Sequence, residues 1–238
     1  VLGWALQFFF PLEKLPFELK SLTRHQLKER LGLPKEGPLA IKVLKKQDLY
    51  GLRLMQIEFQ GRSLKTEAYL LIPEAKGAFP TVLCLHGHHS TKEELVGLKS
   101  SRFGVDFGLK LARMGFVILA PDIPYSKDLR KEDFFSLKLI MAGGSLTGLR
   151  LSLLQAMLDY ISQQPFVDPE RIGCAGWSMG GGLCLYLSAI DRRVKATAIS
   201  GYFGTFKGTF MRRRHSTDNY IPGILQVGEM HDIACLIA

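Results

Sequence analysis

The sequence predicts an α/β protein folded as a three-layer α/β/α sandwich, and two observations carry this prediction. Thr81–His86 and Phe116–Ala120 are uninterrupted apolar runs, which is typical of strands covered by helices on both faces. Such runs alternate along the chain with segments of helical spacing, of which Leu149–Gln164 is the longest. Alternation of strand and helix indicates a parallel sheet with crossover helices. Hydrophobic residues make up 47% of the 238 residues, enough for a sizeable buried core.

The other elements follow from apolar spacing and turn residues. In chain order we expect a helix over Ser21–Leu31 with Ser21 as candidate cap, a hairpin of Leu52–Gln60 and Leu64–Ile72, a helix over Val105–Met114, a strand over Arg171–Ala175, a helix over Met179–Ile190 and a strand over Val194–Ser200. Two long stretches, 123–148 and 201–230, look irregular, and long connections commonly carry binding loops. We therefore divide the chain into an N-terminal helical extension, residues 1–50, and a core, residues 51–238.

Charge and composition exclude several classes of protein. The formal net charge is +9, but the basic residues are scattered among acidic ones and no nucleic-acid-binding motif accompanies them. The apolar run Val1–Leu12 is too short to cross a bilayer and lacks the features of a signal peptide. The four cysteines lie apart from one another, so we expect buried free thiols: Cys84, Cys174, Cys184 and Cys235. We expect a cytoplasmic protein without nucleic-acid or membrane partners.

The clearest chemical motif is Gly176-Trp177-Ser178-Met179-Gly180, which matches G-x-S-x-G. The motif alone is weak in a chain with 24 glycines, but here a predicted strand precedes it and a predicted helix follows it, as a nucleophile elbow requires. A sharp strand-to-helix turn leaves no room for a Cβ two residues before and after the serine. We therefore predict that Ser178 is a nucleophile exposed at the carboxyl edge of the sheet.

An oxyanion hole is expected beside the serine. The N–H of Met179, at the start of the helix, is one candidate donor, and the N–H of His88, in the loop after Thr81–Leu85, is the second. A metal site is the rival interpretation, because His86 and His88 are spaced as in H-x-H-x-D-H hydrolases. Ser90 and Thr91 stand where that motif needs its Asp and last His. We therefore predict no metal and no cofactor, with His86 and His89 in supporting roles.

The order of these motifs along the chain resembles the order found in proteins of the α/β-hydrolase fold. It comprises the hairpin, a strand ending at His86-Gly87, a strand ending at Ala120-Pro-Asp122, the segment Val167–Gly173 and the elbow. Within that fold the chain is similar to the dienelactone-hydrolase-like and acetyl-xylan-esterase-like branch, including at His215–Gly223 and Gly228–Asp232. The resemblance covers roughly residues 50 to 238 and implies a small-molecule ester substrate. Dienelactone hydrolases use a cysteine nucleophile, so Ser178 indicates that this chain is more similar to the serine esterases of the branch.

The acid and the base of a triad are not assigned. In this fold they follow the serine on loops after later strands, and two further strand and helix units need about 30 residues each. We therefore expect a chain truncated before its last core strands, part of a longer polypeptide and by itself catalytically incompetent. His215 and His231 have Asp218 and Asp232 nearby in sequence, but nearness in sequence is not triad geometry, so His215 and Asp218 are expected only in supporting roles.

The function that this pattern favours is hydrolysis of carboxylic esters, acetyl-ester or dienelactone-like, through an acyl-enzyme on Ser178. One alternative is a peptidase or other acyl hydrolase of the same fold. Another is a non-catalytic binding or scaffold protein, because the acid and base are not found. The oligomeric state does not follow from the sequence.

Overall fold

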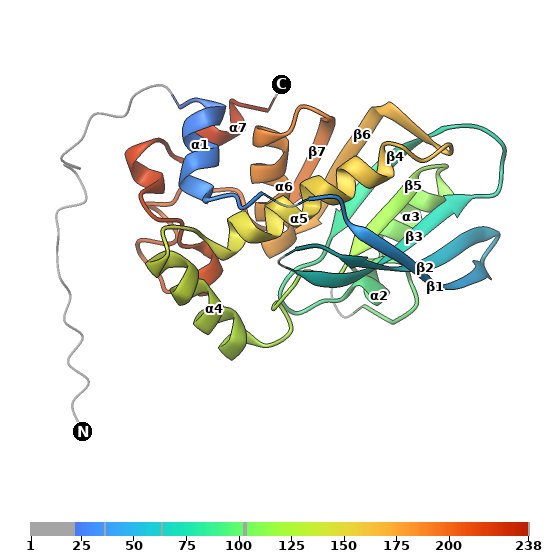
Figure 1. Ribbon diagram of the computed structural model, residues 1–238, viewed down its shortest axis with the longest axis horizontal. Coiled ribbons are helices and arrows are strands. Elements are labelled where there is room, and N and C mark those ends of the chain that lie inside the picture. The colour runs from blue at the N-terminus through green and yellow to red at the C-terminus, as the bar shows by residue number, and fades with distance from the viewer. Residues whose placement is uncertain (1–21, 36, 63, 102–103, 238) are drawn as a thin grey trace.

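A mixed β-sheet forms the centre of the computed structural model, which describes residues 22–35, 37–62, 64–101 and 104–237 (Figure 1). Within these residues the sheet has seven strands in the order β1-β2-β3-β5-β4-β6-β7. The strands are β1 (Ala40–Leu49), β2 (Leu52–Gln60), β3 (Lys65–Pro73), β4 (Phe79–Leu85), β5 (Val117–Pro121), β6 (Val167–Trp177) and β7 (Val194–Ser200). The predicted hairpin of β2 and β3 is confirmed, and β5, β4, β6 and β7 run parallel.

Helices cover both faces of the sheet, which confirms the predicted three layers. They are α1 (Arg24–Leu31), α2 (Lys92–Leu95), α3 (Phe107–Arg113), α4 (Leu129–Met141), α5 (Leu146–Ile161), α6 (Met179–Ile190) and α7 (Met230–Ala234). One hydrophobic cluster joins the sheet to α1, α5, α6 and α7, and a second joins its other face to α2 and α3. In β5, Val117 and Leu119 belong to the first cluster and Ile118 and Ala120 to the second. This two-sided burial explains the uninterrupted apolar run in the sequence.

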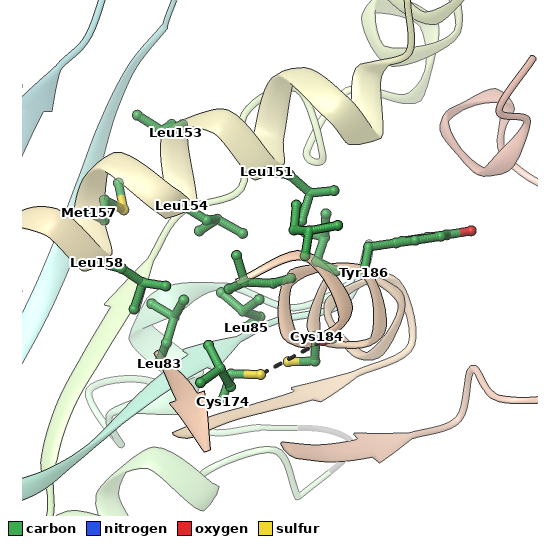
Figure 2. Packing of buried hydrophobic residues seen from close by; sticks show 14 of the residues in the cluster. Leu83, Leu85, Leu151, Leu153, Leu154, Met157, Leu158, Cys174, Cys184 and Tyr186 are labelled. Carbon is green, nitrogen blue, oxygen red and sulfur yellow. Dashed lines mark hydrogen bonds between the residues drawn. The ribbon is translucent and has the colours of Figure 1, made fainter. Parts of the chain in front are cut away.

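The larger cluster lies between α5, α6 and the sheet (Figure 2). Leu154 and Leu158 of α5 gather there with Leu83 and Leu85 of β4, and all four side chains are at most 2% exposed. Cys84, Cys174 and Cys184 are free and buried, as predicted, whereas Cys235 is free but exposed. Burial of those three thiols follows from their places on β4, β6 and α6, where Cys84 packs in the second hydrophobic cluster and Cys174 and Cys184 in the first.

The expectation of a helical extension over residues 1–50 is wrong at Ala40–Leu49, which forms the edge strand β1 and pairs antiparallel with β2. The strand is mostly exposed on both faces, so its sequence lacks the apolar alternation by which half-buried strands are identified. Helix α1 begins later than predicted. Thr23 is its N-cap, in a capping box with Gln26, and Ser21 lies outside the described residues.

The expectation of an irregular stretch over 123–148 is also wrong. Helix α4 occupies half of it, capped by the Asp128 side chain, which accepts hydrogen bonds from the N–H groups of Arg130 and Lys131. Its outer face carries exposed apolar residues, including Phe134 and Met141, so no clean apolar stripe marks it as a helix. The 201–230 stretch is irregular as predicted, apart from two 3₁₀ turns, η1 (Thr217–Asn219) and η2 (Ile224–Gln226).

No single helix among the described residues is long and apolar enough to span a membrane. The adjacent helices α4 and α5 reach that length and hydropathy only as a pair, and they are bent by 96° at the break between them.

We predict that α1 stabilises the fold because its buried leucines pack in the larger hydrophobic cluster, between the sheet and α5 and α6. Leu27 is 0% exposed, so Leu27→Ala should lower the free energy of unfolding by about 2–5 kcal/mol, because it leaves a cavity. Lys28→Ala, on the exposed side of the same helix, should change it by less than about 0.5 kcal/mol. Urea denaturation measures both, and equal effects would show that α1 does not share the core.

Candidate active site

Ser178 lies at a sharp turn between β6 and α6, as the sequence predicted. Its backbone has φ 54° and ψ −122°, a positive φ that side-chain-bearing residues rarely adopt. Its N–H donates to the carbonyl oxygen of Ser200 at 2.8 Å, which ties the turn to the end of β7. Such strain persists only where the surroundings enforce it, and it marks the turn as a candidate functional position.

The glycines around Ser178 are required by close backbone contact. A Cβ on Gly176 would lie 2.2 Å from the carbonyl oxygen of Gly180, and a Cβ on Gly180 would lie 2.2 Å from that of Leu85. A Cβ on Gly87 would come within 3.0 Å of the Ser178 Cβ. The loop after β4 therefore lies directly against the turn, because β4 and β6 are parallel neighbours with Leu85 opposite Gly176.

Ser178 opens into a pocket of about 360 Å³ at the carboxyl edge of the sheet. The walls come from the loop after β4, from the start of α4 and α6, and from the 201–230 stretch. The lining residues are His88, His89, Leu129, Ser178, Met179, Gly201, Tyr202, Thr209, Phe210, His215, Ser216 and Asn219. The long 201–230 connection, in which the sequence analysis looked for binding loops, supplies much of this lining.

The two predicted oxyanion donors, the N–H groups of Met179 and His88, belong to residues that line this pocket with Ser178. Among the described residues neither N–H donates to another backbone group. His88 is held in a tight turn in which the N–H of Gly87 donates to the Ser90 hydroxyl at 3.1 Å and the N–H of Ser90 donates to the Gly87 carbonyl at 3.2 Å. The turn thus holds His88 beside the pocket that it lines together with Met179.

His86 has a structural role. Its Nδ1 donates to the Gly87 carbonyl at 2.8 Å and its Nε2 accepts from the N–H of Ile123 at 3.0 Å. Both ring nitrogens are therefore used by the backbone, and the side chain is 0% exposed. Burial lowers the pKa of His86 to about 4, against a smaller opposing effect of the Gly87 carbonyl. A neutral, fully bonded His86 fits the predicted supporting role rather than the metal interpretation.

A buried group of four ionisable side chains lies beside the pocket. The Arg150 guanidinium of α5 donates to Glu132 Oε2 at 2.7 Å and to Asp218 Oδ2 at 2.6 Å. The Nε2 atom of His88 lies 2.9 Å from Glu132 Oε1 and 3.4 Å from Asp218 Oδ2. Arg150, Glu132 and Asp218 are each at most 3% exposed. Arg150 also donates to Met179 Sδ at 3.4 Å, which links the group to the elbow.

The charges in this group balance. Burial by itself lowers the pKa of His88, but its hydrogen bonds to Asp218 and Glu132 outweigh burial and raise that pKa to about 9. Two cations, His88 and Arg150, therefore face two carboxylates at neutral pH. His88, Glu132 and Asp218 are close enough together to hold a metal ion, but Arg150 already satisfies both carboxylates. The arrangement fits an ion-pair network better than a metal centre.

The other histidines are not placed as a base for Ser178. Within the described residues, no histidine side chain hydrogen-bonds the Ser178 hydroxyl. His89 and His215 line the pocket, and the ring of His215 packs edge-on against Phe210 with centroids 4.7 Å apart. His231 is exposed on α7 beside Asp232. Asp218 is buried behind the pocket, next to the lining residue Asn219, and it is held by Arg150 and His88 rather than by His215.

Sequence reasoning missed Glu132 and Arg150. Arg150 did leave a signal, because it is a charged residue inside the apolar helix α5, and a buried guanidinium needs buried anionic partners. Glu132 left no such signal, because its helix was not predicted. The contact between Glu132 and His88 spans 44 residues of chain, and Arg150 reaches its two carboxylate partners across 18 and 68 residues.

The fold and the elbow define an α/β-hydrolase. Among solved structures, the protein described as a putative acetyl xylan esterase from Bacteroides fragilis superposes with a TM-score of 0.78 over 90% of this chain and 64% of its own, at 22% identity. A glucuronoyl esterase from Solibacter usitatus superposes with a TM-score of 0.63 over 90% of this chain and 71% of its own, at 12% identity. At such identities these similarities establish the fold alone.

The chain belongs to the dienelactone hydrolase family, whose family model matches residues 66–224. A relative from Bacillus subtilis named "Putative hydrolase YtaP" is 27% identical over 74% of this chain and 62% of its own length. One from Synechocystis named "Putative carboxymethylenebutenolidase" is 30% identical over 60% of this chain and 56% of its own length. The chain thus spans less than two thirds of these curated relatives.

We predict that the backbone contact at Gly180 is essential to the elbow. Gly180→Ala should lower the free energy of unfolding by about 1–3 kcal/mol or more, because the new Cβ meets backbone atoms that cannot move aside. Gly144→Ala is the control, since its Cβ would lie 3.7 Å from its nearest neighbours. Guanidinium denaturation compares the two, and equal stabilities would contradict the contact.

We predict that burial of neutral His86 makes stability depend on pH. Its pKa is about 4 when folded against an ordinary 6.5, so the unfolded chain binds the proton first, and stability should fall by roughly 3 kcal/mol as pH decreases from 6.5 to 4. His86→Gln should lose this part of the pH dependence, and His25→Gln, on the exposed face of α1, should keep it. Urea midpoints between pH 4 and 7 measure it; an unchanged slope in His86→Gln would contradict the assignment.

Proposed function

We propose that this protein is a serine-dependent hydrolase of carboxylic esters and that Ser178 is its nucleophile. The observation that carries the proposal is the strained turn at Ser178, which presents the serine in a pocket lined by Met179 and His88. Membership of the dienelactone hydrolase family and the esterase folds that superpose on this chain support the same reaction class. A small-molecule ester suits a pocket of about 360 Å³.

The proposed reaction proceeds through an acyl-enzyme. The hydroxyl oxygen of Ser178 attacks the acyl carbon, and the N–H groups of Met179 and His88 hydrogen-bond the oxygen that becomes negative. The proton of the Ser178 hydroxyl ends on the leaving alkoxide, which departs as the alcohol. Water then attacks the acyl-enzyme, its hydroxyl completes the carboxylic acid, and its proton restores the Ser178 hydroxyl. The start of α6 adds the positive end of a helix dipole close to the oxyanion. The proposal assigns no base among the described residues.

The decisive test is the nucleophile. In the protein expressed from its complete reading frame, Ser178→Ala should reduce hydrolysis of an aryl acetate by several orders of magnitude while circular dichroism remains unchanged. A fluorophosphonate probe should label the parent protein and not the variant. Ser162→Ala, on the half-buried residue that caps the C-terminus of α5, should keep both activity and labelling. Activity near that of the parent in Ser178→Ala would remove the serine from the mechanism.

Two alternatives are outcomes of the same assay. Faster cleavage of an anilide than of the matching aryl ester would assign a peptidase-like acyl hydrolase. Absence of both turnover and probe labelling in the folded protein would favour a non-catalytic binding protein of this fold. The same assays on the 238-residue chain by itself test the expectation that it is catalytically incompetent.

A further inference from the structure

The two ring nitrogens of His88 have different surroundings. Nε2 contacts the buried carboxylates of Glu132 and Asp218, at 2.9 and 3.4 Å. Nδ1 has no hydrogen-bond partner among the described residues. His88 lines the Ser178 pocket and its side chain is 11% exposed. One nitrogen therefore anchors the ring in the protein, and the other, in a side chain that lines the pocket, has no partner in the described part of the chain.

The anchor is itself rigidly held. Glu132 and Asp218 each share Arg150, which also donates to the Pro124 carbonyl at 2.8 Å. The second Asp218 oxygen accepts from the Asn219 amide at 2.9 Å. A side chain fixed through this many buried contacts loses little conformational entropy when it binds a substrate. This is the condition for electrostatic preorganisation.

We propose that the Nδ1–H of His88 donates a hydrogen bond to the substrate oxygen that becomes negative when Ser178 attacks. This proposal rests on the proposed function, and it adds the side chain of His88 to an oxyanion hole otherwise made of backbone N–H groups. No proton is transferred in this role; the charged ring stabilises the oxyanion through a charge-assisted hydrogen bond. The substrate class it favours is an ester whose carbonyl oxygen reaches the His88 side of the pocket.

The protonation of His88 supports the role. The carboxylates keep the pKa of His88 at about 9 in spite of burial, so at neutral pH the ring carries a hydrogen on both nitrogens. The charged groups that face it are Glu132 on α4, Asp218 on η1 and Arg150 on α5. The other titratable residues that line the same pocket are His89, His215 and Tyr202.

Kinetics as a function of pH test the proposal. With an aryl acetate and the complete protein, kcat should fall as pH rises through about 9, because deprotonated His88 loses the Nδ1–H when its remaining hydrogen stays on Nε2 between the carboxylates. His88→Phe should lower kcat at pH 7 by about 100- to 1000-fold, the cost of one oxyanion donor, with little change in KM. His89→Gln, the neighbouring histidine, should keep the decline near pH 9.

Glu132→Gln distinguishes this role from a structural one and remains informative if His88→Phe does not fold. Removal of one carboxylate lowers the pKa of His88, so the decline in kcat should move to lower pH while the protein stays active. A decline that does not move, a loss in His88→Phe that lies wholly in KM, or an unchanged kcat in that variant would overturn the proposal.

Failure of the proposed function is recognised separately. NMR titration of the His88 ring in Ser178→Ala needs no activity, and we expect a midpoint near 9 that falls in the double variant with Glu132→Gln. A midpoint near 6.5 would overturn the role of His88 whatever the nucleophile is. A midpoint near 9 together with full activity in Ser178→Ala would overturn Ser178 as nucleophile instead.

Discussion

The close contact of three backbone segments at the carboxyl edge of the sheet is the constraint on which the site depends. At Gly176 and Gly180 there is no space for a Cβ, because each would lie 2.2 Å from a carbonyl oxygen of a neighbouring segment. Only that approach allows β6 to turn directly into α6 and hold Ser178 at φ 54°. The same contact brings the loop after β4 against the serine. The pocket, the amide donors and the position of His88 all follow from it.

The second determinant is electrostatic. A carboxylate or guanidinium buried alone would cost several kcal/mol in desolvation, so the chain buries two charges of each sign together. Arg150 and His88 share Glu132 and Asp218, and the four residues come from α4, α5, η1 and the loop after β4. This network therefore determines how the long 201–230 stretch and α4 sit against the elbow. Among the described residues, no hydrogen bond engages the other ring nitrogen of His88, and His88 lines the Ser178 pocket.

Helices and strands were predicted correctly from the sequence where the spacing of apolar residues matches the side of the element that is buried. The bounds of α6 and β7 were predicted residue by residue, because apolar runs and flanking turn residues mark them. Strand β1 was missed because both of its faces are exposed, and α4 because its outward face carries Phe134 and Met141. In both, the hydrophobic pattern does not report which side faces the core. Strand β1 depends on pairing with the next strand, β2, and α4 depends on its contacts with α5 and η1.

The sequence by itself determined the layered α/β fold, the strand–turn–helix around Ser178 and the need for glycine at that turn. These features arise from steric contacts between residues close in sequence and from the spacing of apolar residues along the chain. Both can be recognised in short stretches of the sequence. The tertiary structure alone shows that His86 is neutral and hydrogen-bonded to the backbone through both ring nitrogens. It also shows that His88 is a cation paired with Glu132 and Asp218, the carboxylates that Arg150 contacts as well. The protonation of a histidine depends on its burial and on the charges around it. Here the two carboxylates that contact His88 lie 44 and 130 positions away along the chain, and Arg150 pairs with the same carboxylates across 18 and 68 positions.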